Sequence, residues 1–318
     1  MVLRLWEARS AMGIFVALDG GGTKTQCWVA DDTRVLGRAV GGTVKIMMVG
    51  EELASARLRE VIAEAAGAAG VDPKDATRTC MGLAGITSES TRAWAERTLQ
   101  GIVGGELDLC GDEEIALDAA FHGGPGLLVV AGTGSNVVGR CSSGAMVSTG
   151  GWGPVIGDDG SGTWIGLEAI RAGLRAHDRG VPTCLLREIE AHWELDDLGE
   201  LIAKANERSR PDFAELAMVV ARCAEGGDAL AMSVLDRAGA ELAEQVSLAA
   251  GKMRASGSAA GDANHVAFTG SVLEKIARVR RSMEEHLHAA LPEAQVAQQA
   301  VESMEGALWR ARKTVNSD

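Results

Sequence analysis

The 318-residue sequence contains no tyrosine, and aromatic residues make up only 3% of it. A hydrophobic core must therefore be built mainly from Ala, Val, Leu, Ile and Met. Six prolines stand against 41 glycines, which predicts many tight backbone sites. Apolar residues at 46% and charged residues at 24% exclude an intrinsically disordered chain, and the length predicts two domains.

The cysteines are also few, and no two of the six are close enough in sequence to form a CxxC pair. This excludes the common zinc and redox motifs. The spread is typical of reduced, buried thiols in a cytoplasmic protein.

Basic residues are fewer than acidic ones, 31 against 44, which gives a formal net charge of −13. This excess argues against a protein that binds nucleic acid or anionic membranes non-specifically, but it allows one local basic pocket for a phosphate.

Long apolar runs are absent as well. The longest charge-free window, residues 119–139, is interrupted by Gly, Pro, Thr, Ser and Asn, so no membrane-spanning helix is expected. Residues 1–12 carry charges and lack the apolar segment of a signal peptide, so they are either a loose extension or precede a true start at Met12.

The hydrophobic pattern predicts an order of elements that starts twice. The first half has strands at 14–18, 26–30 and 35–40, a helix at 51–69, a strand at 79–83, a helix at 89–99 and a strand at 106–110. The second half has strands at 126–130, 136–141 and 145–148, helices at 163–176, 183–192, 213–225 and 229–255, a strand at 265–268, a helix at 273–287, a strand at 294–297 and a helix at 302–312. A strand, a glycine turn and a second strand thus occur at 14–30 and again at 126–141, which indicates an internal duplication and two α/β domains with a cleft between them.

A sparsely charged segment supports a binding function. Between Ala119 and Gly157 the only formal charge is Arg140, and the segment is rich in Gly, Ser and Thr. Such a composition suits polar, buried binding loops better than a solvated surface.

The first candidate motif is Asp19-Gly20-Gly21-Gly22-Thr23-Lys24-Thr25, which joins a strand to a strand. Its glycines let backbone N–H groups approach an anion such as a phosphate, and Asp19 can hold Mg²⁺ through water. An ordinary hairpin is the alternative, and Lys24 either contacts phosphate or is solvated. The motif is neither a Walker P-loop nor a GxGxxG turn.

Two further glycine turns follow apolar strands. Residues 131–136, Ala-Gly-Thr-Gly-Ser-Asn, repeat the position of the first motif, so the pair would clamp the β- and γ-phosphates of a nucleotide. The alternative is a plain β-turn. Gly270 and Ser271 open a predicted helix, where small residues let an adenosine approach the backbone or serve only as a helix cap.

A glycine-rich loop at 150–161 carries Trp152, Asp158 and Asp159. An aromatic ring with a carboxylate suits a sugar, whereas a surface loop is the alternative.

Asp112 follows the strand at 106–110, where it either caps the next helix or acts as a general base toward an attacking hydroxyl. Glu113, Glu114 and Asp118 are its competitors.

The order of these motifs, with Met304-Glu305-Gly306-Ala307 near the end, resembles the BadF/BadG/BcrA/BcrD ATPase family and, within it, the N-acetylglucosamine kinases. The resemblance covers residues 14–312. It implies an α/β fold of two ribonuclease H-like (actin-like ATPase) domains with a central cleft. The expected domains are 13–117 with 301–318, and 118–300 with a helical insertion.

The resemblance also implies site residues. It places the phosphates at Gly21, Gly22, Thr23, Lys24 and Thr25 and at Gly132, Thr133 and Gly134, with Mg²⁺ at Asp19, adenosine at Gly270 and Ser271, and the catalytic base at Asp112. It places the sugar at Ser135, Asn136, Trp152, Gly153 and Asp158. After the third strand, Val44 or Lys45 replaces the Asn expected to contact the sugar, so Lys45 is a further candidate. Thr149 stands where the mammalian enzymes have Cys.

The expected activity is phosphoryl transfer from ATP to a hydroxyl of an amino sugar, N-acetylglucosamine first, at C6. Its partners are then ATP, Mg²⁺ and the sugar, with neither nucleic acid nor membrane, and the family often forms homodimers. One alternative is an iron–sulfur ATPase that activates a dehydratase or reductase, but residues 158–163, Asp-Asp-Gly-Ser-Gly-Thr, lack the cysteine of those proteins. The other alternative is a sensor that binds sugar and ATP without turnover.

Overall fold

The computed structural model describes residues 13–209, 211–259 and 261–313, so the expectation for residues 1–12 lies outside the described part. The chain divides into two compact units. One comprises the described residues up to Gly123 together with those from Val301 onward, and the other comprises 124–300.

The first unit is built on a five-stranded sheet of order β3-β2-β1-β4-β5. Its strands are β1 (Phe15–Gly20), β2 (Lys24–Ala30), β3 (Val35–Gly42), β4 (Arg78–Leu83) and β5 (Glu106–Cys110). The first three form an antiparallel meander, whereas β4 and β5 run parallel to β1. The short loops between β1, β2 and β3 explain the meander, because antiparallel strands need no crossover helix.

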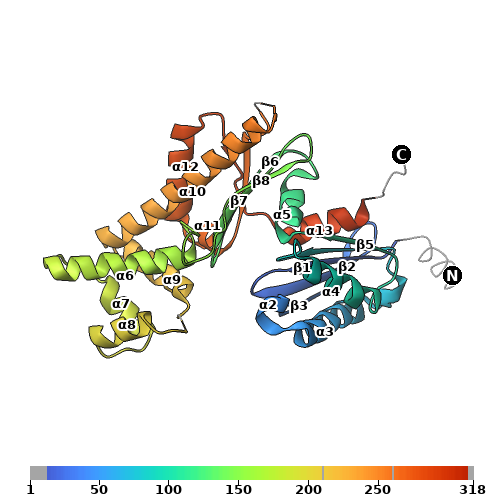
Figure 1. Ribbon diagram of the computed structural model, residues 1–318, viewed down its shortest axis with the longest axis horizontal. Coiled ribbons are helices and arrows are strands. Elements are labelled where there is room, and N and C mark those ends of the chain that lie inside the picture. The colour runs from blue at the N-terminus through green and yellow to red at the C-terminus, as the bar shows by residue number, and fades with distance from the viewer. Residues whose placement is uncertain (1–12, 210, 260, 314–318) are drawn as a thin grey trace. The chain divides into compact units, whose positions relative to one another are not determined.

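Both faces of this sheet are covered by helices (Figure 1). Val16 and Leu18 of β1 pack on the side of α2 (Ile46–Val49), α3 (Glu51–Ala69) and α4 (Glu89–Gln100), with η1 (Pro73–Asp75) before β4. Phe15 and Ala17, which alternate with them, pack on the side of α5 (Asp112–Phe121) and α13 (Ser303–Arg312). The last helix therefore returns to complete the first unit.

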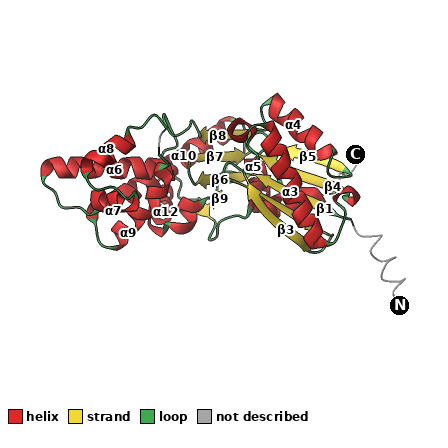
Figure 2. Ribbon diagram, turned by 90° about the horizontal axis from the view of Figure 1, so that it is seen from below, coloured by secondary structure: helices red, strands yellow, loops and turns green. Residues whose placement is uncertain are grey.

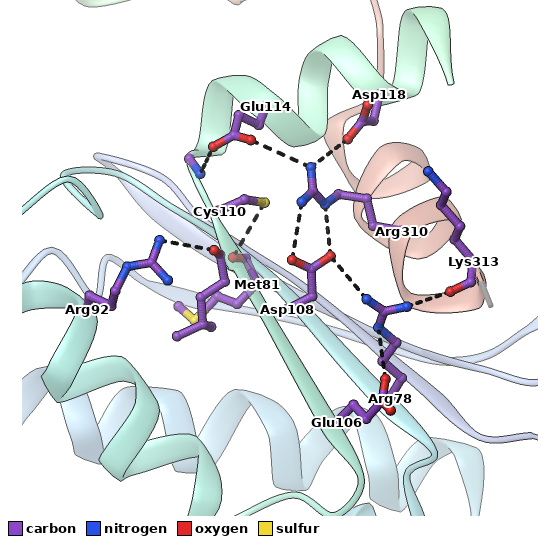
Figure 3. A network of polar contacts seen from close by, with 12 residues as sticks. Arg78, Met81, Arg92, Glu106, Asp108, Cys110, Glu114, Asp118, Arg310 and Lys313 are labelled. Atoms are coloured by element: carbon purple, nitrogen blue, oxygen red, sulfur yellow. Dashed lines mark hydrogen bonds and ion pairs between the residues drawn. The ribbon is translucent and has the colours of Figure 1, made fainter. Parts of the chain in front are cut away.

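Arg310 fixes this returning helix (Figure 3). Its guanidinium donates to both oxygens of Asp108 on β5, at 3.0 and 3.2 Å, and to Asp118 on α5 at 2.9 Å. Arg78 of β4 approaches Asp108 to 3.8 Å, and its guanidinium also donates to the carbonyl of Lys313. A largely buried cation thus joins α13 to the sheet and to α5 through charge-assisted bonds.

The second unit repeats the sheet with order β10-β9-β6-β7-β8 (Figure 2). Its strands are β6 (Gly126–Ala131), β7 (Ser135–Arg140), β8 (Met146–Gly150), β9 (His265–Thr269) and β10 (Gln295–Val296). The helices are α6 (Gly162–Arg179), α7 (Leu185–His192), α8 (Leu198–Ala205), η2 (Phe213–Glu215), α9 (Leu216–Glu225), α10 (Ala229–Ala255), α11 (Ser271–Lys275) and α12 (Ala277–Ala290). One hydrophobic cluster joins β6, β7 and β9 to α6, α9, α10 and α12. The predicted fold class, α/β with a duplicated sheet, is confirmed.

Three features differ from the sequence expectation. The predicted helix at 273–287 is two helices, α11 and α12, separated at Ile276, whose φ of −108° and ψ of 83° are not helical. Neither Gly nor Pro marks this break, and Ile276 is buried as an apolar anchor. Helices α2 and α8 were not expected, because one or two turns give too short a pattern to detect. The expected domain boundary near Leu117 falls inside α5, which packs along α13 as one element of the first unit.

No helix in the described ranges is long and apolar enough to cross a membrane.

Candidate functional site

Two carboxylates lie at one edge of the first sheet. Asp19 is the next-to-last residue of β1, and Asp112 follows the end of β5. Because β1, β4 and β5 are parallel, the carboxyl ends of β1 and β5 share this edge. Ligands of α/β sheets bind at that edge as a rule.

Asp112 is not the helix cap that one interpretation of the sequence expected. Gly111 is the N-cap of α5, and Asp112 is its first helical residue. The backbone N–H of Gly111 donates instead to Glu114 Oε1 at 3.0 Å. Glu114 and Asp118, two of the competitors for the role of base, form ion pairs with Arg310 at 3.7 and 2.9 Å. Asp112 and Glu113 remain in the first turn of α5, and Asp112 is the one that comes first after β5.

The environment perturbs both carboxylates in the same direction. Burial raises the pKa of Asp19 to about 6; a hydrogen bond from Ser303 opposes the rise, and the charge of Asp112 adds to it. Burial also raises the pKa of Asp112, while backbone N–H groups of Asp112 and Glu113 and the charge of Lys45 oppose that rise. Two half-buried carboxylates at one sheet edge, where the charge of Asp112 raises the pKa of Asp19, favour a bound cation.

The donor set here fits Mg²⁺ rather than a closed metal cage. The described residues contain no group of three or more His, Cys, Asp or Glu side chains placed to hold a metal. Mg²⁺ commonly takes one or two carboxylates and completes its shell with water and substrate phosphates. Asp19, with Asp112 nearby, supplies that kind of partial shell.

The first glycine hairpin connects β1 and β2 beside Asp19. Gly22, Thr23 and Lys24 are exposed. Gly22 has no positive φ, and a Cβ placed on it would meet no atom within 4 Å. The chain itself therefore does not require glycine there, whereas a ligand that approaches the backbone does. Thr25, which was expected to contact phosphate, is fully buried beneath the loop.

The segment after β3 is tied to this hairpin. The Thr43 hydroxyl donates to the carbonyl of Gly21 at 3.0 Å and accepts from the N–H of Lys45 at 3.1 Å. Val44 is completely buried in the core, so it is not available to contact a sugar. Lys45 is half-buried, and its charge acts on Asp112. Of the two residues that replace the expected Asn, Lys45 is the one at the acidic edge.

The second hairpin connects β6 and β7, and the first residues of α6 form hydrogen bonds to it. The Gly132 N–H donates to the carbonyl of Gly134 at 2.9 Å, and the Gly132 carbonyl accepts from Gly162 at 2.8 Å. The Thr163 hydroxyl donates to the carbonyl of Thr133 at 2.8 Å. Because the Gly132 N–H is used inside the turn, contacts to a phosphate fall to the remainder of the loop, where Thr133 is exposed.

A cavity of about 230 Å³ joins this hairpin to the start of α11. Gly132, Thr133, Gly162, Ser271 and Lys275 are among the residues that line it. The structure thus brings together the second expected phosphate loop and an expected adenosine residue. Lys275, Glu215 and Met218 also line the cavity, and no sequence motif marked them.

Gly270 makes that approach possible. Its φ is 102°, and a Cβ there would lie 2.4 Å from the carbonyl oxygen of Ala131. A larger residue would separate the β9–α11 turn from the hairpin. Its N–H donates to Glu274 Oε1 at 2.9 Å, and Ser271 provides no side-chain cap. Gly270 is thus the N-cap of α11, as the cap interpretation of the Gly-Ser pair expected, but Ser271 does not cap the helix with its side chain.

Asp158 links the second hairpin to the loop at 150–161. It is buried with a positive φ of 58°, and it accepts the N–H of Gly153 at 3.1 Å. Burial raises its pKa, and the charge of Asp159 adds to the rise. A Cβ on Gly134 would lie 2.7 Å from Asp158 Oδ2, so the hairpin requires glycine at this contact. Trp152, in contrast, is 72% exposed.

Ser135 and Asn136 begin β7 below this loop. The Ser135 hydroxyl donates to the carbonyl of Asp159 at 2.7 Å. Asn136 faces the loop closely enough that a Cβ on Gly151 would lie 3.2 Å from its own Cβ. Of the expected sugar residues of this unit, Ser135, Asn136, Gly153 and Asp158 are thus joined through these contacts, and Trp152 lies exposed in the same loop.

Gln245 of α10 supports this set, and the sequence analysis missed it. Its Nε2 donates to the Asp159 carbonyl at 2.9 Å, and its backbone carbonyl accepts from the Thr149 hydroxyl at 2.9 Å. The only available signal was a polar residue on the buried face of a long helix.

Comparison with known proteins gives a consistent result. The model of the BadF/BadG/BcrA/BcrD ATPase family matches residues 16–308. An N-acetylmuramic acid/N-acetylglucosamine kinase of Clostridium acetobutylicum is 32% identical over 237 residues, which is 73% of this chain and 77% of the relative. An N-acetyl-D-glucosamine kinase of Dictyostelium discoideum is 29% identical over 237 residues, 70% of this chain and 74% of the relative.

Solved structures share the fold. A protein of Chromobacterium violaceum, provisionally named an N-acetylglucosamine kinase, superposes with a TM-score of 0.70 at 23% identity, covering 94% of this chain and 98% of its own. The ROK hexokinase of Thermus thermophilus superposes with a TM-score of 0.57 at 18% identity, covering 94% and 98%. The expectation of an actin-like, sugar-kinase fold is confirmed.

Proposed function

The chain belongs to the BadF/BadG/BcrA/BcrD ATPase family, and we propose that it transfers the γ-phosphoryl group of ATP to the C6 hydroxyl of an amino sugar, with N-acetylglucosamine as the first candidate. The N-acetylglucosamine kinases among its relatives support the substrate class. The observation that carries the chemistry is the pair formed by Asp19 and Asp112 at the carboxyl edge of the first sheet.

In this proposal Asp112 accepts the proton of the attacking hydroxyl. Its raised pKa makes it a stronger base than a solvated carboxylate, while the charge of Lys45 opposes that rise. Asp19 would hold Mg²⁺, which when bound neutralises charge on the phosphates. Lys45 would also lie where it senses an anionic or polar group of the sugar.

The two glycine hairpins, Gly21–Thr25 and Gly132–Gly134, would hold the phosphates, and Gly270 and Ser271 would border the adenosine. The cavity of about 230 Å³ beside Thr133 and Ser271 supports that assignment. Because this volume is below that of typical whole-ligand pockets, the cavity suits part of a nucleotide. In the sugar site, Trp152 would offer its exposed ring, and Asp158 and Asn136 would bind hydroxyl or amide groups.

We also propose a cytoplasmic location, which the six free cysteines favour. The homodimer remains a prediction that the oligomeric mass in solution would test.

The experiment that tests the function is ADP release with Mg-ATP against N-acetylglucosamine, glucosamine, N-acetylmannosamine, N-acetylmuramic acid and glucose. We expect the highest kcat/KM with N-acetylglucosamine, and the product should carry phosphate at C6 in a phosphorus NMR correlation. ATP binding without ADP release for any sugar would favour the sensor and contradict the kinase.

A further inference from the structure

A second, larger cavity of about 630 Å³ opens in the second unit beside the loop at 150–161. Residues 154–157 of that loop form one wall, and α6 forms another with Trp164, Leu167 and Arg171. Residues 205–208, at and after the end of α8, complete it. None of the residues assigned above to ATP or to the sugar lines this cavity.

The residues that line this cavity include equal numbers of cations and carboxylates, together with apolar side chains. Two cations, Arg171 and Arg208, and two carboxylates, Asp159 and Glu207, line it, and the amide of Asn206 adds both donors and an acceptor. Leu167, Phe213 and Val155 provide the apolar part. A dianion would require an excess of positive charge, whereas this mixture suits a ring that presents hydroxyl groups along its edge and C–H groups on its face.

The guanidinium of Arg171 forms an ion pair with a buried carboxylate. Its Nη1 lies 2.8 Å from Glu168 Oε1, and Glu168 is buried. The same carboxylate is 3.1 Å from Arg237 and 3.9 Å from Arg175. Burial works against the charge of Glu168, but the bonds from Arg171 and Arg237 outweigh it and lower its pKa. Arg171 thus lines the cavity while its guanidinium is paired with Glu168.

The cavity is continuous with the loop of the proposed sugar site. Gly153 and Asp158 close that loop through the bond between N–H and carboxylate, and the segment between them lines the cavity. Val155 and Ile156 within it are 68% and 80% exposed, an unusual state for large apolar side chains in a short loop. Asp159 lines the cavity, while its carbonyl accepts from Ser135. The cavity and the proposed sugar site therefore share this loop.

We propose that this cavity is an accessory saccharide subsite, so that the acceptor class includes amino sugars bearing a second sugar unit. This inference rests on the proposed function, because it places the reacting sugar at Trp152, Gly153 and Asp158. A second sugar ring would pack its C–H face on Leu167 and Val155 and would bond its hydroxyls to Arg171 and Asn206.

The test compares kcat/KM for N-acetylglucosamine and for N,N′-diacetylchitobiose, with calorimetric binding of both to the full chain. We expect the disaccharide to be phosphorylated at least as efficiently as the monosaccharide. Arg171→Ala should lower kcat/KM for the disaccharide about tenfold, the usual effect of losing one charge-assisted hydrogen bond, and change the monosaccharide value less than about twofold. Arg175→Ala is the matched control, because Arg175 shares Glu168 but does not line the cavity.

A second variant, Ala205→Trp, fills the cavity from the end of α8 without touching the ion pairs. It should reduce disaccharide turnover and leave monosaccharide turnover intact. Equal effects of Arg171→Ala on both sugars, or none on either, would overturn the subsite. So would an Arg171-dependent preference for N-acetylmuramic acid over the disaccharide, because the occupant would then be a carboxylate. If neither sugar is phosphorylated, N-acetylglucosamine fails as the acceptor, yet Arg171-sensitive calorimetric binding of the disaccharide would still support the subsite.

Discussion

The hydroxyl of Ser303 donates a hydrogen bond to the carboxylate of Asp19, although 284 positions separate the two residues in the chain. Ser303 is the first residue of α13, which returns to the first unit. A contact from the far end of the chain therefore acts on the carboxylate that we assign to Mg²⁺.

Ser303→Ala tests the functional weight of this contact. The bond opposes the rise in the pKa of Asp19, so its loss should raise that pKa further and weaken binding of Mg²⁺. We expect the Mg²⁺ concentration for half-maximal rate to rise about tenfold, in line with a hydrogen bond to a charged group. Ser303→Thr keeps the hydroxyl and should remain close to wild type. An unchanged Mg²⁺ dependence of the rate in Ser303→Ala would mean that Asp19 does not hold the metal.

Asp112→Asn tests the catalytic base. The amide cannot accept the hydroxyl proton, so kcat should fall about 10²–10⁴-fold while KM for ATP stays within about threefold. Glu89→Gln is the control, because Glu89 also stands in the first turn of a helix but is exposed on α4. Steady-state ADP release measures both variants. Turnover of Asp112→Asn within tenfold of wild type would remove Asp112 from the mechanism.

Gly22→Ala tests whether ATP approaches the backbone at Gly22, because the substitution should change ATP binding without changing the stability of the fold. A Cβ at Gly22 meets no atom of the chain within 4 Å, and its φ is not positive, so the variant should fold with an unchanged Tm. If the γ-phosphate packs against this backbone, the methyl group should raise KM for ATP about tenfold or more. Gly67→Ala on α3 has equally open surroundings but lies far from the hairpin in sequence. It should keep the ATP parameters and gain stability of about 0.5–1 kcal/mol. Equal KM values in the two variants would contradict the phosphate assignment.

Much of the fold could be predicted because local patterns were strong and consistent. Helices α3 and α10 and strand β5 have the bounds that their periodicity predicted. The break at Ile276 could not be predicted, since neither glycine nor proline marks it.

The candidate site also has features that the sequence predicted and features that it could not predict. Glycine motifs and the acidic residues after strands could be recognised as sequence, because backbone access and charge are local properties. The burial of Thr25 and Val44, and the support that Gln245 gives to Asp159, arise from contacts between distant segments. Whether Val44 or Lys45 faces the acidic edge depended on which one the core buries, which a single sequence does not reveal.

Arg310→Met tests how α13 is held. Burial disfavours the charge of Arg310, but the bonds with Asp108 and Asp118 outweigh it and raise its pKa far above the ordinary value. Removing the cation leaves the buried Asp118 without this partner, and breaking such a pair costs about 3–5 kcal/mol. Arg97→Ala breaks an ion pair with Glu51 in which both side chains are more than half exposed, and it should cost less than about 1 kcal/mol. Urea unfolding measures both, and similar losses would mean that the Arg310 network does not anchor the helix.

The pKa of Asp19 makes stability depend on pH in a direction opposite to that of most paired carboxylates. Its folded-state value, about 6, lies above the ordinary 3.8, so the folded protein favours the protonated form. Ionisation therefore costs stability as the pH rises through about 6, and the cost is absent below about 3.8.

At about 1.4 kcal/mol per pH unit, this cost reaches an upper limit of about 3 kcal/mol at pH 7.5. Asp19→Asn fixes a neutral side chain that still accepts a hydrogen bond from Ser303. In EDTA at pH 7.5 the variant should thus be more stable than wild type toward urea, and at pH 4 the two should converge. Saturating Mg-ATP should reverse the order at pH 7.5, because only the carboxylate gains from the cation. A variant less stable than wild type in EDTA at pH 7.5 would mean that Asp19 is already satisfied by its protein neighbours, which would leave no electrostatic reason for a metal at this edge.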